Sequence, residues 1–397
     1  MRNILTINGG SSSIRFAVFS AEHPPGRLLQ GKLDRIGSGD MELIVESGAA
    51  GAAACIKVPS DARGTPAGFL LDWLESQPVF ESIGGAGHRV VHGMQHTEPE
   101  AVTAALIDEL KRIVPFDPEH LPREIELIEA LWHRHRQLPQ VVCFDTAFHR
   151  SMPHIAALLP IPRRYAAKGV QRYGFHGLSY TFLMQELARL GDPAAERGRV
   201  ILAHLGGGAS LAAVRNGRCI DTSMGFTPAA GLVMGTRSGD LDPGLMSYLA
   251  LTDAMTARQF QAMVNHESGL LGVSETSADV RELLDRESDD PRAADALALF
   301  CYQAKKWIGS FAAALGGVDT LVFAGGIGEN AAPIRRRICE GLSFLGIDID
   351  DDANGRHAER ISPRAASVSV RVIRTDEESV IADLTARLLD VRQTKEI

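Results

Sequence analysis

Residues 4–19 read ILTINGGSSSIRFAVF, and residues 200–214 read VILAHLGGGASLAAV. Each segment has an apolar run, a turn of glycine and other small residues, and a second apolar run, which is typical of two strands joined by a hairpin. Because the pattern recurs in opposite halves of the chain, it predicts a duplicated domain. Either turn alone would be an ordinary hairpin turn. Two copies favour loops whose backbone N–H groups face phosphate.

The length and composition bound the class of protein. The chain has 397 residues, more than one hydrophobic core usually serves, so we expect two domains. Hydrophobic residues make up 45% and charged residues 23%, as in ordinary globular proteins. The net charge of −8, without a basic stripe carrying aromatic residues, argues against nucleic acid as a partner. The five cysteines are scattered without a CxxC pair, and we expect buried, reduced thiols.

The N-terminus does not resemble a targeting segment. Its apolar stretch before Asn8 is too short for the core of a signal peptide. No run of the sequence approaches the ~18 apolar residues that a membrane span needs. We therefore expect a cytoplasmic protein without a membrane partner.

The hydrophobic periodicity predicts alternating strands and helices, and hence α/β layers. Strands are expected at 140–144, 320–324 and 367–374, and helices at 66–77, 101–114, 123–136, 254–265, 291–315 and 378–391. Residues 325–330, GGIGEN, are expected as a loop in which Asn330 caps a helix that starts at Ala331.

Three glycine clusters follow predicted strands, at 9–10, 206–208 and 325–328. None matches the P-loop pattern GxxxxGK[ST] or the GxGxxG fingerprint of a dinucleotide site. Several glycine turns at strand ends suit a nucleotide whose phosphates are bound by backbone from several sides. Phosphoryl transfer is therefore the favoured reaction class.

Phosphoryl transfer needs cations around the transferred group. Arg89 lies between apolar residues in GHRVVHG (87–93), where burial without an anionic partner would be costly. Arg237 lies in the small-residue loop MGTRSGDLDP (234–243), which suits a bidentate grip on phosphate or carboxylate. The alternatives are an internal ion pair for Arg89 and a solvated loop charge for Arg237.

Mg²⁺ is usually held by one or two carboxylates. Asp145 and Glu377 each follow an apolar strand and are candidates, although either residue would also serve as a helix N-cap. His176, in RYGFHGL (172–178), is a candidate donor to a phosphoryl oxygen, while a packed or surface histidine is the alternative.

These phrases together resemble the acetate kinase family, within the acetate and sugar kinase, heat-shock chaperone and actin superfamily. The resemblance covers the chain in family order, and its segments are NGGSSSIRF (8–16), GHRVVHG (87–93), FDTAFH (144–149), RYGFHGLS (172–179), DTSMGFTPAAGLVMGTRSGDLDP (221–243), FAGGIGEN (323–330) and TDEE (375–378). It implies an α/β fold of two duplicated ribonuclease-H-like (actin-like ATPase) domains with an interdomain cleft. The expected domains are 1–148 plus 378–397, and 149–377, which would bind nucleotide.

The resemblance also implies roles for individual residues. Arg89 and Arg237 would bind the carboxylate and stabilise the transferring phosphoryl group, which His176 would contact, and Asp145 would orient an arginine. Asn8 and Glu377 would bind the metal. Four residues would line the acyl pocket, namely Val91, Phe116, Phe175 and Pro228. Nucleotide contacts would come from Ser13, Arg15, His204, Gly206, Gly207, Gly208, Asp279, Arg281, Gly325, Gly326, Gly328 and Asn330.

The chain departs from the family pattern in two places. Where the family usually has HLGNG, residues 204–208 read HLGGG, so Gly207 replaces a phosphate-facing asparagine. Where the family usually has Pro-Leu-His-Asn-Pro, residues 115–118 read PFDP, so a transition-state histidine is missing and Phe116 replaces a pocket leucine. His120 is displaced from that position, and we assign it no catalytic role.

The activity implied by the resemblance is reversible, direct in-line transfer of the γ-phosphoryl group of ATP to acetate, giving acetyl phosphate and ADP. It would use Mg²⁺, with Mn²⁺ as an alternative, in a homodimer formed through the second domain. A propionate or other short-chain fatty acid kinase is the alternative, since one methylene changes discrimination by only about 1–3 kcal/mol. A nucleotide-binding module with weakened catalysis is a third hypothesis, because both departures concern the reaction centre.

Overall fold

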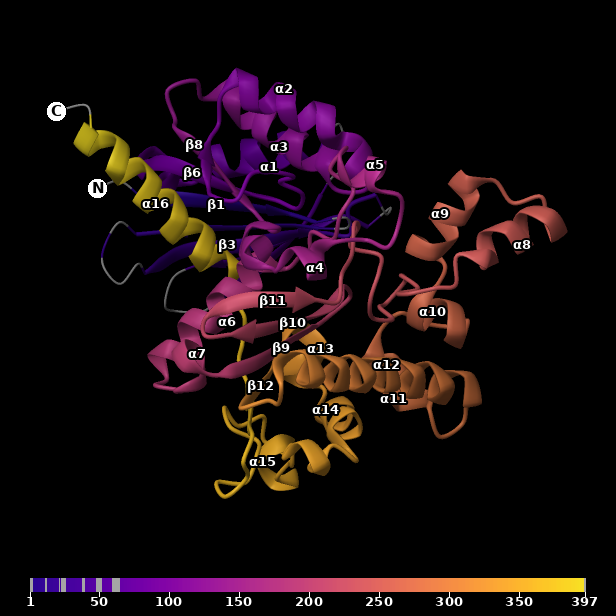
Figure 1. Ribbon diagram of the computed structural model, residues 1–397. Helices are drawn as coiled ribbons and strands as arrows, with labels where there is room; N and C mark the ends of the chain where they lie inside the picture. The colour runs from indigo at the N-terminus through magenta and orange to yellow at the C-terminus, as the bar shows by residue number, and fades with distance from the viewer. Residues whose placement is uncertain are drawn as a thin grey trace. The chain divides into compact units, whose positions relative to one another are not determined.

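The computed structural model describes residues 3–10, 13–20, 22, 26–37, 40–47, 52–58 and 65–395. The chain forms two compact units, one made of residues 1–147 and 376–397 and the other of residues 148–375. Each unit contains one β-sheet with helices packed on it (Figure 1). The predicted α/β class is therefore confirmed.

The sheet of unit 1 has eight strands in the order β5-β4-β3-β2-β1-β6-β8-β7. Strands β1 to β5 form an antiparallel meander, whereas β1, β6 and β8 are parallel neighbours. The strands are β1 (Asn3–Gly9), β2 (Ile14–Phe19), β3 (Arg27–Asp34), β4 (Glu42–Ser47), β5 (Ala52–Lys57), β6 (Ile83–Val90), β7 (Glu100–Ala101) and β8 (Gln140–Phe144).

Helices cover both faces of this sheet. Since successive residues of a strand point to opposite faces, neighbouring residues of β1 and β2 pack against different helices. Leu5, Ile7 and Phe16 pack in the same cluster as α1 (Pro66–Glu75) and α3 (Leu121–Arg134). Ile4, Ala17 and Phe19 pack instead against α16 (Glu377–Lys395), drawn in yellow in Figure 1. Two short 3₁₀ turns, η1 (Pro78–Ser82) and η2 (Val114–Phe116), and α2 (Ala104–Ile113) complete the unit.

Close approach of α16 to β6 depends on two glycines. A Cβ at Gly87 would overlap Thr385, and a Cβ at Gly85 would overlap Leu389. Only glycine therefore lets α16 lie directly against the strand that ends in Arg89 and Val90.

The sheet of unit 2 has five strands in the order β11-β10-β9-β12-β13. The strands are β9 (Arg199–Leu205), β10 (Ala209–Arg215), β11 (Arg218–Thr222), β12 (Thr320–Ala324) and β13 (Ser369–Val372). An antiparallel meander, β9-β10-β11, is followed by the parallel strands β12 and β13. Unit 1 has the same arrangement in β3-β2-β1-β6-β8, which confirms the duplication predicted from the repeated hairpin.

The helices of unit 2 also lie on both faces of its sheet. Tyr180 and Leu183 of α6 (Gly177–Arg189) pack on the sheet with α7 (Ala194–Arg197), and α12 (Pro291–Leu315) packs against β10 and β9. The remaining elements are η3 (Ala147–Ser151), α4 (His154–Ala157), α5 (Arg163–Ala166), α8 (Gly244–Thr252), α9 (Ala257–His266), α10 (Gly269–Ser274), α11 (Val280–Arg286), α13 (Gly325–Asn330), α14 (Ala332–Cys339), η4 (Ser343–Leu345) and α15 (Asp351–Gly355).

Several sequence predictions need correction. Residues 325–330 form the short helix α13 rather than a loop, and the Asn330 amide donates to the carbonyl oxygen of Gly326 instead of capping α14. The N-cap position of α14 is Ala331, which has no side-chain acceptor. Cys55 is exposed, whereas the other four cysteines are buried as expected. No helix in the described part of the chain is long and apolar enough to cross a membrane.

Candidate active site

Three parallel strands of unit 1 bring Asn8, Arg89 and Asp145 together. Asn8 lies near the end of β1, Arg89 near the end of β6, and Asp145 directly after β8. Because the carboxyl ends of parallel neighbours meet at one edge of a sheet, their side chains converge there, where open α/β sheets usually place ligands. Nε and Nη2 of Arg89 donate to Oδ2 of Asp145 at 3.1 and 2.7 Å.

The Arg89–Asp145 pair is strongly shielded from solvent. Asp145 is fully buried, and 13% of the Arg89 side chain is exposed. Burial alone would lower the pKa of Arg89, but the carboxylates of Asp145, Glu377 and Glu124 outweigh it and raise the pKa above its ordinary value. Among the described residues, Arg89 Nη1 makes long contacts, 3.5 Å to Asn8 Oδ1 and 3.3 Å to the Gly9 carbonyl oxygen. This end of a permanent cation is thus suited to a stronger anionic acceptor.

Asn8 also contacts two carboxylates at the start of α16. Its Nδ2 donates to Glu377 Oε2 at 2.8 Å and to Glu378 Oε1 at 3.3 Å. Burial and the neighbouring Glu377 charge raise the pKa of Glu378, so a cation here would relieve repulsion between the two groups. The helix N-cap role belongs to Asp376, which accepts from the Ser379 N–H.

This oxygen set fits a hard divalent cation. The described residues contain no group of three His, Cys, Asp or Glu side chains that would form a complete metal cage. Mg²⁺, however, is commonly held by one or two carboxylates while substrate phosphates and waters supply the other oxygens. Asn8 and Glu377 therefore suit a Mg²⁺ ion that arrives with a nucleotide.

The remaining predicted residues of unit 1 lie near these strands. The Ser13 carbonyl oxygen accepts from the Gly10 N–H at 2.8 Å in the β1–β2 turn, and Arg15 is exposed on β2. Val91 is buried directly after β6, and Phe116 is half-buried with its ring 5.8 Å from that of His92.

The departure at residues 116–120 forms a buried hydrogen-bonded pair of side chains. His120 Nδ1 lies 2.9 Å from Oδ1 of Asp117, and both residues are buried. Burial opposes ionisation of Asp117, but the hydrogen bond and charge of His120 lower the pKa of this carboxyl below its usual value. His120 is therefore held in place by Asp117.

In unit 2, two histidines stack beside the β9–β10 turn. The rings of His176 and His204 lie 4.3 Å apart at an interplanar angle of 25°. His176 Nδ1 lies 2.9 Å from Ser210 Oγ, which also contacts the Tyr180 hydroxyl. His176 adopts a left-handed backbone, φ 60°, at the start of α6. Such backbone strain in a hydrogen-bonded histidine is a feature found at functional sites.

Arg237 belongs to the same group of residues. A Cβ at Gly208 would lie 3.3 Å from His176 Nε2 and 3.7 Å from Arg237 Nη1, so both side chains border this glycine. Arg237 Nη1 also donates to the Pro228 carbonyl oxygen at 3.3 Å. The fourth predicted pocket residue, Phe175, is buried, and its carbonyl oxygen bonds His149 Nε2.

The predicted nucleotide residues of unit 2 fall into two places. Gly325, Gly326, Gly328 and Asn330 form α13, directly after β12, and Gly206 lies close to the Gly326 nitrogen across the turn. Asp279 and Arg281 lie at the start of α11 and pair with each other at 2.6 Å, leaving Arg281 largely exposed.

Two buried residues of these regions escaped the sequence analysis. Glu124 accepts from the Val91 N–H at 3.0 Å, and Arg335 donates to the carbonyl oxygens of Gly328 and Glu329. Each interrupts an otherwise apolar helix face, which is the sequence signal that would have marked them.

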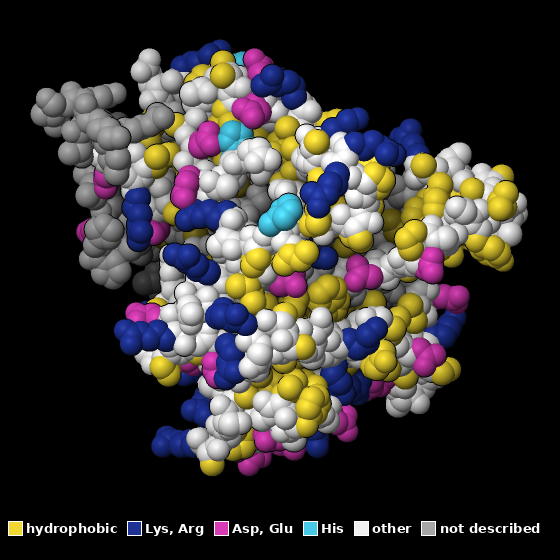
Figure 2. All heavy atoms as spheres, in the orientation of Figure 1, with side chains coloured by type: hydrophobic (Ala, Val, Ile, Leu, Met, Phe, Trp, Pro, Cys, Tyr) yellow, Lys and Arg dark blue, Asp and Glu magenta, His cyan; other side chains and the backbone are white. Residues whose placement is uncertain are grey.

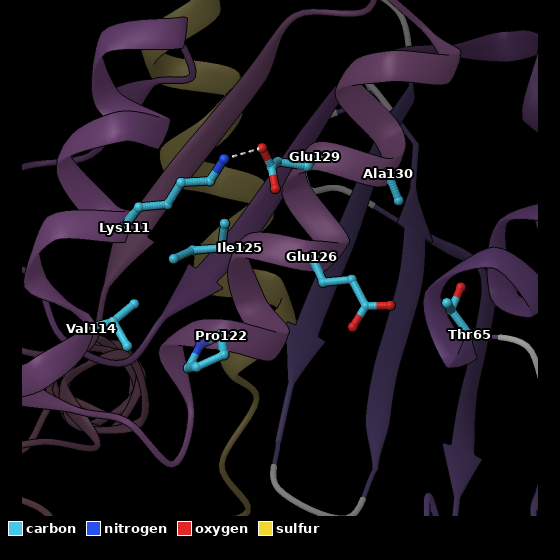
Figure 3. Close-up of a pocket in the computed structure, with 8 residues that line it drawn as sticks. All are labelled: Thr65, Lys111, Val114, Pro122, Ile125, Glu126, Glu129 and Ala130. Carbon is cyan, nitrogen blue, oxygen red and sulfur yellow. Dashed lines mark hydrogen bonds and ion pairs between the residues drawn. The ribbon is translucent and has the colours of Figure 1, made fainter.

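A groove of about 610 Å³ on unit 1 is separate from all predicted site residues (Figure 3). In that view α3 runs through the middle, with Lys111 on one side of it and Thr65 on the other. Lys111 pairs with Glu129 at 2.7 Å. Its lining is Thr65, Lys111, Val114, Pro122, Ile125, Glu126, Glu129 and Ala130.

Comparison with known proteins identifies the family of this chain. A model of the acetokinase family matches residues 3–383. The chain belongs to the acetokinase family. It is 42% identical to an acetate kinase of Rhodopseudomonas palustris, with 98% of both chains covered. Among solved structures of the acetokinase family, it resembles a propionate kinase from Francisella tularensis (TM-score 0.90, 34% identity) and the Porphyromonas gingivalis acetate kinase (TM-score 0.87, 34% identity), each covering 98% of this chain and 100% of the other.

Proposed function

We propose that this protein catalyses reversible phosphorylation of acetate by ATP, giving acetyl phosphate and ADP by direct in-line transfer to the carboxylate. The observation that carries the proposal is Arg89, a buried cation kept charged by Asp145 and beside the Asn8–Glu377 contact. Phosphoryl transfer needs a site that binds an anion close to oxygen ligands for a metal ion, and these residues provide both.

Each charged or polar group has a distinct role in the proposed reaction. Arg89 and Arg237 bind the carboxylate and stabilise charge that spreads over the phosphoryl oxygens, and Asp145 orients Arg89. His176 donates a hydrogen bond to the phosphoryl group, with Ser210 at its other ring nitrogen. Direct attack by a carboxylate oxygen requires no general base, because the nucleophile is ionised at neutral pH. Positioning and charge stabilisation are thus the main contributions of the protein.

Asn8 and Glu377 would hold Mg²⁺, or Mn²⁺ in its place, together with nucleotide phosphates. When bound, the ion neutralises charge on the phosphate oxygens. The glycine backbones at 206–208 and 325–328 would bind the phosphates, with Ser13 and Arg15 as further contacts. Asp279 and Arg281 would contact adenosine. Some of the hydrogen bonds that they now make to each other would then be replaced by hydrogen bonds to the nucleoside.

Propionate is the second candidate acid. It is favoured by Phe116, which changes the pocket residue supplied by the η2 turn, and by likeness to a solved protein named propionate kinase. The pocket would be lined by Val91, Phe116, Phe175 and Pro228. A catalytically weakened ATP-binding module is less favoured, because both arginines and His176 are present.

We further propose a cytoplasmic homodimer whose contact includes α8. No residue of α8 is buried, although the helix contains Leu245, Tyr248 and Leu251. Figure 2 shows hydrophobic side chains gathered over the region of α8 and α9, at the right of the view. We propose that residues 1–148 with 378–397 form one actin-like domain and that residues 149–377 form the nucleotide-binding one.

Trapping acyl phosphate as a hydroxamate tests the proposed activity. Purified protein would be incubated with Mg-ATP and a series of acids from formate to butyrate, with a metal-free reaction as the control. We expect the signal to require Mg²⁺ and to peak at acetate, whereas a peak at propionate would select the alternative. Silence across the series in protein that still binds ATP would contradict the kinase and support the weakened binder.

A further inference from the structure

Glu124 is a buried acid that none of the proposed roles uses. It lies in the first turn of α3, between buried Leu121 and Ile128, and is 2% exposed. Its Oε2 accepts the Val91 N–H at 3.0 Å, while its Oε1 has no hydrogen-bond partner among the described residues. A buried carboxyl thus fixes the backbone two residues after Arg89.

Charged groups from several elements surround this acid. Arg89 on β6 favours its ionisation, whereas Asp117 after η2 and Asp145 after β8 oppose it. Burial is the largest influence and raises the pKa of Glu124 to about 8. His120 is held by Asp117, and burial lowers the pKa of His92 to about 4, so that neighbour is neutral. At neutral pH Glu124 therefore carries a proton.

The charge balance around Arg89 makes the protonation of Glu124 important. Asp145 already compensates the single charge of Arg89, and Glu377 adds a second negative charge nearby. If Glu124 ionised as well, Arg89 would face three carboxylates before any substrate arrived. A substrate carboxylate would then enter a more negative environment, which weakens its binding.

We propose that Glu124 is a positioning residue for the carboxylate substrate: as a neutral acid it holds the Val91 backbone beside Arg89, and as a carboxylate it competes with the substrate for Arg89. This inference rests on the proposed function. It gives α3 a role that the family resemblance does not imply. Through Glu124, this helix sets the range of pH in which the substrate carboxylate binds.

The KM for acetate, measured against pH at saturating Mg-ATP, tests the proposal. Acetate and Arg89 keep their charges over this range, so a change in KM centred near pH 8 would report the ionisation of Glu124. With a midpoint of about 8, one-proton competition predicts that the wild-type KM rises about tenfold between about pH 7 and about pH 9. Glu124→Gln keeps an acceptor for Val91 but cannot ionise, and its KM should stay within about twofold over that range.

Two further variants separate positioning from packing. Glu124→Leu removes the acceptor and should raise the acetate KM at every pH while leaving the KM for ATP unchanged. Glu126→Gln removes a carboxylate from the same helix and should keep the wild-type pH dependence. An equal rise of KM in Glu124→Gln and wild type, or a flat wild-type profile, would overturn the proposal.

Acetate binding to the wild-type protein gives a test that needs no variant and no turnover. Because binding favours neutral Glu124, calorimetry near pH 8 in buffers of different ionisation enthalpy should reveal uptake of a proton. Binding without proton uptake overturns the proposal even if Glu124→Gln fails to fold. Binding with uptake but no acyl phosphate from any acid would instead reject the proposed reaction and retain the role of Glu124.

Discussion

At the scale of single residues, Arg89 and Asp145 form a pair in which function and stability are coupled. Nε and Nη2 of Arg89 both donate to Oδ2 of Asp145, whose side chain has no exposure to solvent. Breaking a buried pair by removing one partner is costly, because the other charge remains buried without compensation. The site therefore depends on a cation that the fold also needs.

Arg89→Ala should lower kcat at least about 100-fold, which corresponds to about 3 kcal/mol of lost transition-state stabilisation. It should also destabilise the fold by about 3–5 kcal/mol, because Asp145 loses its partner. Adding Asp145→Asn should recover much of the thermal stability but none of the activity. Hydroxamate kinetics and thermal denaturation would measure these effects.

Arg237→Ala provides the comparison for Arg89. Arg237 Nη1 donates to the Pro228 carbonyl oxygen. Its removal leaves buried Asp145 paired with Arg89, so we expect a similar fall in kcat with a smaller loss of stability. Near-normal turnover in either folded single variant would contradict the site assignment.

Gly207 is the residue at which the chain departs from the family pattern in the β9–β10 turn. No atom of the described residues lies within 4 Å of where its Cβ would be, and its backbone is outside the left-handed region. Gly207→Asn should therefore fold normally and restore an amide contact to phosphate, lowering the KM for ATP about tenfold or more, as expected for one hydrogen bond to a charged group.

Gly208→Asn is the matched control for this substitution. Its Cβ would lie 3.3 Å from His176 Nε2 and 3.7 Å from Arg237 Nη1, so the larger side chain should reduce kcat instead. An unchanged KM for ATP in Gly207→Asn would show that the amide makes no phosphate contact in this protein.

At the scale of elements, α13 depends on a buried cation in α14. Arg335 is fully buried, and its Nη1 donates to the carbonyl oxygens of Gly328 and Glu329 at 2.8 and 3.0 Å. Its Nε and Nη2 bond the side chain and backbone of Asn354 in α15. Arg335 thus satisfies the last carbonyl groups of a six-residue helix that has no side-chain cap.

Arg335→Met should raise the KM for ATP about tenfold or more, because two carbonyl groups of the proposed nucleotide segment lose a charged donor. The KM for acetate should change little, since the acid contacts proposed for unit 1 are untouched. Arg337→Met is the control on the same helix, because Arg337 pairs instead with Glu287 of the α11 end. Equal effects of the two variants on ATP, compared at equal thermal stability, would contradict the positioning of α13.

The sequence predicted the helices and strands better than it predicted the side-chain contacts that stabilise them. The hairpins, β8, β12 and α12 follow from apolar periodicity. Helix α12 also has Pro291 at its start and Gly316 in a left-handed C-cap, both common at helix ends. Helix α13 was missed because three glycines in six residues oppose helix formation, and tertiary contacts such as Arg335 override that preference. Asp145 was expected to orient an arginine, and an internal ion pair was the alternative for Arg89. That these two residues are partners depends on strand order, which local sequence does not encode.

At the scale of the whole molecule, one sheet arrangement occurs twice, with different kinds of residues at its strand ends. Unit 1 places Asn8, Arg89 and Asp145 near the ends of β1, β6 and β8. Unit 2 places the glycine turn and α13 after the corresponding strands β9 and β12. The chain passes between the units at residues 147–148 and 375–376, so a short distance in sequence separates Glu377 from unit 2. Duplication thus supplies two strand-end sites, one rich in charged side chains and one rich in glycine backbone.

The proposed dimer is a property of the whole molecule that the exposed surface of α8 makes testable. Leu251 is 87% and Tyr248 61% exposed, and exposed apolar patches of this kind commonly mark interfaces. A two-fold contact presents the same patch on both copies, so one charged substitution acts twice. Leu251→Asp should therefore convert a dimer to a monomer in sedimentation velocity. Phe344→Asp, at another exposed apolar residue of unit 2, should leave the dimer intact. A monomeric wild type would reject the dimer, and a dimer that survives Leu251→Asp would exclude α8 as its contact.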